Sequence, residues 1–286
     1  MIERIKSDLK TKRFWLTFST RTFAAVGFEA ITLGLYDVIN PNAISKINLP
    51  ISLILLAAAA IYGLVRSWPR PIEQSYSSPK TEIRLLVGDL FSSPENLVIG
   101  MTSTFDTSVP HVIAQTSIQG QFLARIYHHD VQSLDAELAG ALSRFSPIGT
   151  IEKHGKRAVY PIGTVATLQN KRQHYFCVAY SEMDSENRAQ ASIDGLWRSL
   201  TNLWDEVRNR ANGDPVAMPI IGGGQSRISQ ILPAQDSIRF VALSFLLASR
   251  HSRVCERLDI FVRPEDAERI DMLDFQRFLT SLNSST

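Results

Sequence analysis

The feature that most constrains this chain is an apolar run without a single charge, which extends over residues 49–65. A helix needs about 20 predominantly apolar residues to cross a bilayer, with a range of roughly 17–25. Extended to residues 47–68, the run reaches that length and ends beside Arg66 and Trp68, side-chain types that favour the membrane interface. The core helix of a soluble protein normally has one polar face, and this run has none. We therefore predict a transmembrane helix over residues 47–68.

A second apolar segment, residues 14–37, precedes this run and carries two charges, Arg21 and Glu29. A charge left alone near the bilayer centre costs at least about 2.5 kcal/mol. The two residues lie slightly more than two helical turns apart and therefore share one face of a helix. They can pair between neighbouring subunits, or Glu29 can face a water-filled path. We predict a second span here, and the alternative is an amphipathic helix that lies on the membrane surface.

Basic residues flank the two apolar segments on the outside of the hairpin that they would form. They are Arg4, Lys6, Lys10, Lys12 and Arg13 before the first segment and Arg66 and Arg70 after the second. The loop between the segments contains one basic residue, Lys46. Because positively charged flanks stay in the cytoplasm, we expect both termini there. A cleaved signal peptide is not expected, because a second apolar run follows the first at once.

The remainder of the chain has the pattern of one α/β domain. Residues 1–68 form the predicted hairpin, residues 69–80 are rich in proline and serine and are predicted to be an exposed linker, and residues 81–286 form the domain. Strands are predicted over residues 82–87, 97–101, 158–167, 174–180, 215–221 and 257–262, and helices over 118–127, 130–145, 186–211, 235–249 and 266–283. This alternation indicates a largely parallel sheet with helices on both faces. Ligands of such sheets bind at the carboxyl ends of the strands.

Composition and motifs exclude several kinds of chemistry. The formal net charge of +2 is too small to indicate a nucleic-acid partner. Cys177 and Cys255 belong to no CxxC or Cys/His cluster, so neither a disulfide framework nor a metal site is expected. The six histidines occur in no HExxH motif, and no GxxxxGK[ST] sequence is present. We therefore expect no metal, no cofactor and no catalytic residues.

Three stretches that follow predicted strands carry residues suited to a ligand. The first is Asp89, for which a turn or helix-capping role is the alternative. The second is the polar loop that starts at Thr102 and ends at Ser108. The third consists of Gly222, Gly223, Gly224, Gln225, Ser226 and Arg227. Glycine N–H groups can form an anion-binding nest and the three polar side chains add donors, although a plain tight turn is the alternative.

The order of these stretches resembles the macro-domain family. The resemblance rests on Gly88-Asp89-Leu90 after the first strand, on residues 97–108, and on the strand and glycine loop of residues 216–224. It implies a three-layer α/β/α fold with a mostly parallel mixed sheet, and it implies binding of ADP-ribose or a related nucleotide. Asp89 would contact the adenine, Leu90 would belong to the same ligand-binding stretch, and residues 222–227 would hold the diphosphate. The distal ribose would face the second loop, whose candidate residues are Thr102, Ser103, Thr104, Phe105 and Asp106.

The chain departs from that family at the Asn-Ala-Ala-Asn motif, where it has Gly100-Met-Thr-Ser-Thr104, and at the glycine-rich stretch that usually follows. These departures favour a binding protein over a hydrolase. The hairpin together with such a domain resembles the membrane-anchored macro-domain effectors of Thoeris anti-phage systems. That resemblance implies a partner TIR-domain enzyme that makes an ADP-ribose-derived signal, such as an ADP-ribose–amino-acid conjugate.

The same resemblance implies a mechanism and a location. Signal binding would cause homo-oligomerisation of the chain, disruption of the lipid bilayer by the hairpin, and abortive infection. The expected location is the bacterial inner membrane, with the domain in the cytoplasm. Two alternatives remain: a membrane-tethered ADP-ribosyl hydrolase, and a structural membrane adaptor whose domain binds only protein.

Overall fold

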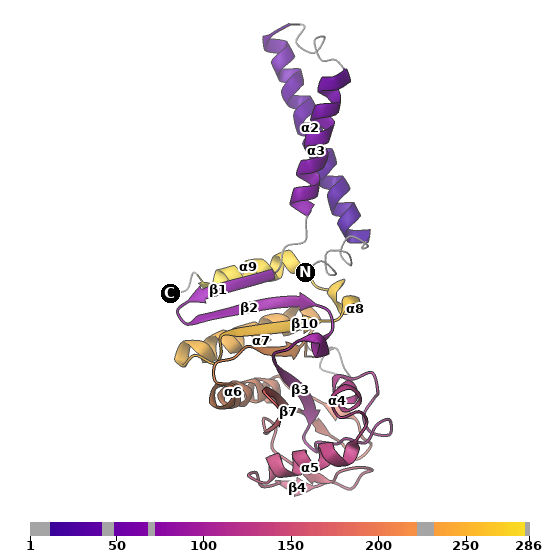
Figure 1. Cartoon of the computed structure of the whole chain (residues 1–286), viewed down its shortest axis with the longest axis vertical. Coiled ribbons are helices and arrows are strands. Elements are labelled where there is room, and N and C mark those ends of the chain that lie inside the picture. Colours follow the sequence, from indigo (N-terminus) through magenta and orange to yellow (C-terminus); the bar gives the residue numbers. More distant parts are fainter. Residues whose placement is uncertain (1–11, 42–48, 68–71, 222–231, 284–286) are drawn as a thin grey trace. The chain divides into compact units, whose positions relative to one another are not determined.

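The computed structural model describes residues 12–41, 49–67, 72–221 and 232–283. The chain divides into two compact units, residues 1–70 and residues 71–286 (Figure 1). The boundary falls close to the predicted end of the hairpin at residue 68.

The first unit is a pair of helices, α2 (Lys12–Ile39) and α3 (Leu49–Ser67). Both are long and apolar enough to cross a membrane, over Phe18–Ile39 and Leu49–Arg66. Both predicted helices are therefore confirmed within the described residues, over Lys12–Ile39 and Leu49–Ser67, whereas their insertion in a bilayer stays a prediction.

Small residues form the seam between the two helices. Ala59 is 1% exposed, and a methyl group added at Gly63 would lie far inside van der Waals contact with Thr22. Larger apolar side chains of both helices, such as Phe28 and Ile54, are exposed instead. The two backbones can approach closely because the contact residues are small.

The second unit is built on one mixed sheet in the order β1-β2-β10-β9-β3-β7-β6, with β8 paired to the end of β7. Five neighbouring strands are parallel: β2 (Lys80–Val87), β10 (Arg257–Val262), β9 (Val216–Pro219), β3 (Asn96–Thr102) and β7 (Gln173–Met183). The antiparallel strands are β1 (Ile72–Ser77), β6 (Val165–Asn170) and β8 (Ala189–Gln190). A separate short pair consists of β4 (Gly149–Thr150) and β5 (Ala158–Val159).

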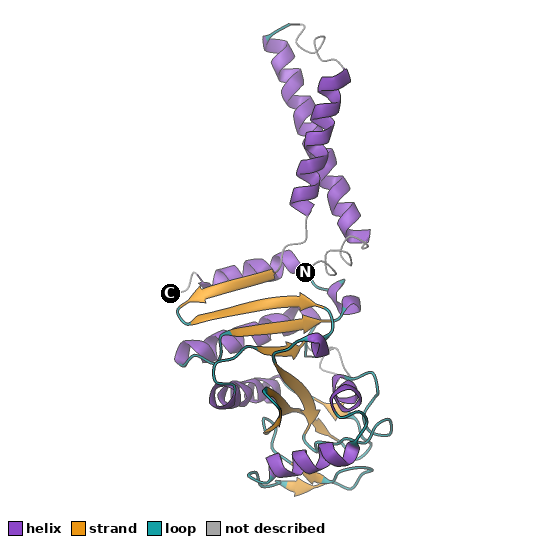
Figure 2. Cartoon of the chain, in the orientation of Figure 1, coloured by secondary structure: helices purple, strands orange, loops and turns teal. Residues whose placement is uncertain are grey.

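Helices cover both faces of this sheet (Figure 2). They are η2 (Leu90–Ser92), α4 (Ile118–Ile126), α5 (Val131–Leu142), α6 (Ile193–Arg210), α7 (Ala234–His251), α8 (Pro264–Ala267) and α9 (Met272–Asn283). Along β3, Leu97, Ile99 and Met101 pack in the cluster with α4 and α5, whereas Val98 packs in the cluster with α6 and α7. This alternation arises because successive side chains of a strand point to opposite faces. The predicted three-layer α/β/α architecture is thus confirmed.

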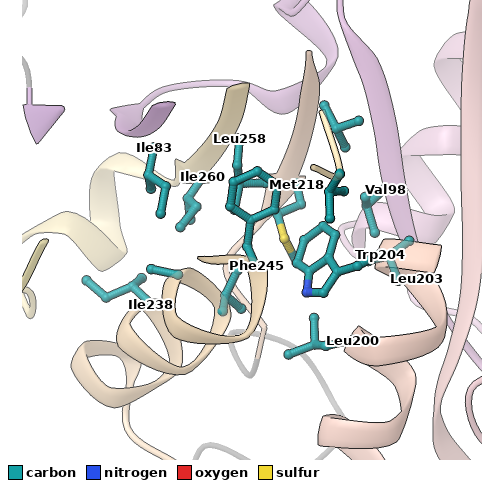
Figure 3. Packing of buried hydrophobic residues seen from close by; sticks show 14 of the residues in the cluster. Ile83, Val98, Leu200, Leu203, Trp204, Met218, Ile238, Phe245, Leu258 and Ile260 are labelled. Carbon is teal, nitrogen blue, oxygen red and sulfur yellow. The ribbon is translucent and has the colours of Figure 1, made fainter. Parts of the chain in front are cut away.

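The larger core cluster lies beneath α6 and α7 and is centred on aromatic residues. Figure 3 shows Trp204 and Phe245 beside Met218 and Ile260 of the sheet. The two aromatic rings meet edge to face at 5.2 Å, and the Trp204 indole N–H donates to Ser244 Oγ at 3.0 Å. Trp204 is fully buried in this core, whereas Trp197 of the same helix remains 39% exposed at the domain surface.

The exposed linker predicted over residues 69–80 is wrong for residues 72–77, because these form the edge strand β1. The strand is held by α9: the buried Tyr76 hydroxyl donates to the Leu279 carbonyl at 2.9 Å, and the Gln276 side chain bonds both backbone groups of Glu73. These partners lie about two hundred residues away, at sequence separations of 203. The polar composition of residues 72–77 therefore predicted a linker, although a helix distant in sequence stabilises them as a strand.

Three predicted elements differ more substantially from the structure. The strand predicted over residues 158–167 is divided into β5 and β6, with Gly163 at φ +93° between them. The helix predicted from residue 186 begins only at Ile193, because Ser192 caps it by accepting from Gly195 N at 3.0 Å. The helix predicted over residues 266–283 is divided into α8 and α9.

Candidate functional site

A cavity of about 560 Å³ opens at the carboxyl ends of the parallel strands. Its walls include Gly88 after β2, Thr102 at the end of β3, Ser181 in β7, Pro219 at the end of β9 and Arg263 after β10. A cavity of this size is in the range that small-molecule ligands occupy. Its position is the one predicted from the alternation of strands and helices.

Asp89 lies at the wall of this cavity and also shapes its own loop. Its Oδ1 accepts from Phe91 N at 3.1 Å and so starts the short helix η2. Its Oδ2 is ion-paired with Arg125 of α4, and both side chains are close to half exposed. An exposed pair of this kind contributes only about 0–1 kcal/mol. Asp89 therefore has the capping role that was the alternative interpretation, and it also has a partner that a ligand can replace at little cost.

The predicted ligand loop is divided between the cavity and the protein interior. Thr102 lines the cavity, as do Asp89 and Leu90. The next four residues are buried and are not part of the cavity wall; they are Ser103, Thr104, Phe105 and Asp106. Phe105 adopts φ +49° and packs edge to face against Tyr160 at 5.7 Å. The structure thus brings together Asp89, Leu90 and Thr102, but not the rest of the loop.

A fully buried ion pair explains why the loop turns inward. Asp106 Oδ2 lies 2.6 Å from Lys153 Nζ, and neither side chain is exposed. The same carboxylate accepts from Thr104 Oγ1 at 2.5 Å and from Lys156 N at 2.7 Å. Removing one partner of a buried pair costs about 3–5 kcal/mol, because the other charge is left without compensation. Asp106 therefore holds the loop and is not free to bind a ligand.

Several cavity residues were not identified from the sequence. Arg125 and Asn187 line the wall, yet both belong to segments predicted only as helix. Tyr180 lies against Gly100, where any side chain would collide with its ring. Gly100 is the one signal that was present, because a glycine in a strand often marks a close approach.

Other predicted residues lie elsewhere or outside the described residues. The glycine loop, Gly222 to Arg227, falls in the undescribed segment 222–231, although Pro219 and Ile221 just before it line the cavity. Arg21 and Glu29 are both partly exposed on α2. They lie slightly more than two turns apart on one continuous helix and so share one face of it.

Within the described ranges, no group of three or more His, Cys, Asp or Glu side chains could hold a metal ion. Both cysteines are buried free thiols. Burial raises the pKa of Cys177 far above its usual range, and it raises that of Cys255 to about 12. Because a thiol must ionise to act as a nucleophile, neither is suited to covalent catalysis at neutral pH.

Comparison with known proteins agrees with this arrangement. Residues 83–263 match the family model described as "Thoeris protein ThsA, Macro domain". The Thoeris protein ThsA of Bacillus amyloliquefaciens (strain Y2) is 26% identical over 205 residues, which are 69% of this chain and 68% of the relative.

Solved structures of the Oceanobacillus iheyensis macrodomain were also found. A mutant form has a TM-score of 0.48 at 11% identity and covers 76% of this chain and 97% of that chain. The form described as "with ADP" has a TM-score of 0.47 at 10% identity and covers 76% and 100%. The family model, which matches more than half of the residues, decides the assignment: this chain belongs to the macro-domain family of Thoeris protein ThsA.

Proposed function

We propose that this chain is an anti-phage defence effector whose domain binds an ADP-ribose-derived signal and whose hairpin then disrupts the membrane. The observation that carries the proposal is the cavity at the carboxyl ends of five parallel strands, with Asp89 at one end of it. From β2 to β7 the sheet order includes four inter-strand spacings, or about 19 Å at about 4.8 Å each. The site is therefore long enough for an extended nucleoside diphosphate that carries a second sugar.

The charged groups of the cavity suit such a ligand. The Asp89 carboxylate can accept from the exocyclic amino group of adenine. Arg125 and Arg263 also line the wall, and arginine forms strong, directional hydrogen bonds to phosphate oxygens. In the ligand-free structure Arg263 Nη2 lies 2.8 Å from Asp266 of α8. Binding of a diphosphate would therefore exchange ion pairs within the protein for ligand contacts.

The chemistry of the described residues favours binding without turnover. The thiols are buried and protonated, and the Asp106 carboxylate is enclosed by Lys153. We therefore propose that the chain is not an enzyme and uses no cofactor. A membrane-tethered ADP-ribosyl hydrolase is the alternative, and release of ADP-ribose from a conjugate would support it.

The domain offers a covalent route from the cavity to the hairpin. The first residue of β1, Ile72, pairs with Leu85 of β2, three residues before Gly88. The chain therefore enters the domain on the strand pair that leads to Asp89. A ligand can shift the chain between two states only if it binds them with different affinity. We propose that the bound state is a homo-oligomer whose hairpins disturb the lipid bilayer. The bilayer is the bacterial inner membrane, and the domain lies in the cytoplasm. A TIR-domain enzyme is the proposed source of the signal.

The test uses the full chain in detergent and in lipid vesicles. Calorimetric titration with ADP-ribose and with ADP-ribose–amino-acid conjugates should show binding, which Asp89→Ala should weaken. Glu152→Ala is the matched control, because this carboxylate is 83% exposed and lies outside the cavity. Glu29→Gln should keep binding and lose ligand-induced vesicle leakage. The proposal fails if none of these ligands binds the wild-type chain.

A further inference from the structure

A chain of polar contacts joins two points of the cavity wall through the protein interior. It starts at Thr102, whose Oγ1 lies 3.2 Å from Thr104 Oγ1. Thr104 donates to Asp106, and Asp106 is paired with Lys153. Lys153 Nζ also donates to Asn187 Oδ1 at 3.1 Å. Thr102 and Asn187 both line the cavity, whereas the three residues between them are buried.

Asn187 is held in place by its backbone as well as by Lys153. It lies in the turn between β7 and β8 and adopts φ +58°, a conformation that asparagine tolerates better than most residues. Its N–H donates to Asp184 O at 3.1 Å. The Asp184 carboxylate in turn accepts from the backbone N–H groups of Glu186 and Arg188, at 2.9 and 2.8 Å. The amide of Asn187 is therefore fixed before any ligand arrives.

Lys153 also decides which way this amide is turned. An ammonium group has donors only, so the Asn187 atom that faces it must be the carbonyl oxygen. The two N–H donors on Nδ2 are then directed away from Lys153. Among the described residues no acceptor bonds them. A ligand at this wall would therefore meet hydrogen-bond donors and not an acceptor.

The sheet order places Asn187 opposite the adenine end of the cavity. Asp89 follows β2 and Asn187 follows β7, and these strands are four inter-strand spacings apart, or about 19 Å. A ligand whose base is held at Asp89 would present its other end to Asn187.

We infer that Asn187, oriented by Lys153, determines specificity by donating hydrogen bonds to an oxygen acceptor at the ligand end opposite the base. The inference rests on the proposed function. Two sources of that acceptor are compatible with the geometry: a hydroxyl of the distal ribose and a carboxylate of a conjugated amino acid. ADP carries neither, so its affinity should not depend on Asn187.

The experiment compares ADP, ADP-ribose and an ADP-ribose–amino-acid conjugate by calorimetric titration of the full chain in detergent. Asn187→Asp keeps the turn conformation and the contact with Lys153 but removes both N–H donors. Asn187→Gly removes the side chain without adding charge and tolerates the positive φ. Glu186→Gln is the control, because it lies in the same turn with a side chain that is 66% exposed.

Both Asn187 variants should bind ADP-ribose or its conjugate about five to ten times more weakly, the loss expected for one net hydrogen bond, and ADP within about twofold of wild type. A loss for the conjugate alone assigns the contact to the amino acid, and a loss for both assigns it to the ribose. The inference is overturned, with the proposed function intact, if wild type binds ADP-ribose and the variants lose no affinity or lose it equally for ADP. Failure of wild type to bind any of the three ligands overturns both.

Discussion

The two units of this chain bury opposite kinds of residue. In the hairpin, the seam is formed by Ala59 and Gly63, and large apolar side chains such as Phe28 are exposed. In the domain, Trp204 and Phe245 are fully buried. A water-soluble surface rarely shows a contiguous apolar patch of more than a few hundred Å². The difference is the one expected if the hairpin lies in a bilayer, as proposed, and the domain folds in water.

The physical reason is the driving force available to each unit. In water, burial of a large apolar side chain contributes about 1.5–3 kcal/mol, so the domain gathers its aromatic residues beneath α6 and α7. In lipid there is no such gain, because the acyl chains are as apolar as the side chains. Helices then associate through close contact of small residues. Equal substitutions made in both units test this difference.

The largest effect is expected from the same truncation of a phenylalanine in the two units. Phe245→Ala should lower the free energy of unfolding of the domain by about 3–5 kcal/mol, because it leaves a cavity beside Trp204. Phe28→Ala on α2, where the side chain is 72% exposed, should change the free energy of unfolding of the hairpin by less than about 0.5 kcal/mol. Urea titration of the full chain in detergent, followed by tryptophan fluorescence, measures both. Equal losses would contradict the conclusion that the two units bury opposite kinds of residue.

A smaller effect is expected from enlarging a glycine in the hairpin. Gly63→Leu should separate α2 from α3 at a cost of about 1–3 kcal/mol, because the new side chain collides with Thr22. Gly34→Leu is the matched control, since nothing lies within 4 Å of its added methyl group. Electron paramagnetic resonance between spin labels on Leu35 and Ile51 should show a longer distance only for the first variant. An unchanged distance would show that small residues at the seam do not set the spacing of the two helices.

The smallest effect is a pH dependence that belongs to the domain. Burial, which outweighs the opposing charge of Arg250, raises the pKa of Tyr76 from 10.0 to about 12. The neutral phenol is thus favoured in the folded state, so its contribution to stability is complete below about pH 10 and is lost as the pH rises towards 12.

Tyr76→Phe supplies the control for this titration. It removes the hydrogen bond to Leu279, so it should be less stable than wild type by about 1 kcal/mol at neutral pH. That gap should shrink between pH 10 and 12, as wild type loses the stability that the variant never had. Urea midpoints measured for both proteins across this range provide the check, and a constant gap would show that Tyr76 does not titrate with folding.

Much of the fold was predictable because it depends on local patterns. The apolar run of residues 47–68 and the alternating segments of the sheet carry their own periodicity, and α3, β2, β3 and β10 follow them closely. Residues 72–77 were not predictable in this way. Their strand depends on Tyr76 and Glu73 meeting α9, which is distant in sequence.

The candidate site shows the same division. Two apolar helices and a strand that ends just before Asp89 could be predicted from the sequence, because apolar runs and strand ends are properties of neighbouring residues. The inward turn of Asp106 and the position of Asn187 at the cavity wall follow from long-range contacts instead. Both depend on Lys153, which lies 47 residues from Asp106 and 34 from Asn187. A buried charge needs a partner of opposite charge, and that partner can come from any part of the chain. No local pattern therefore specifies the sequence separation between the two residues.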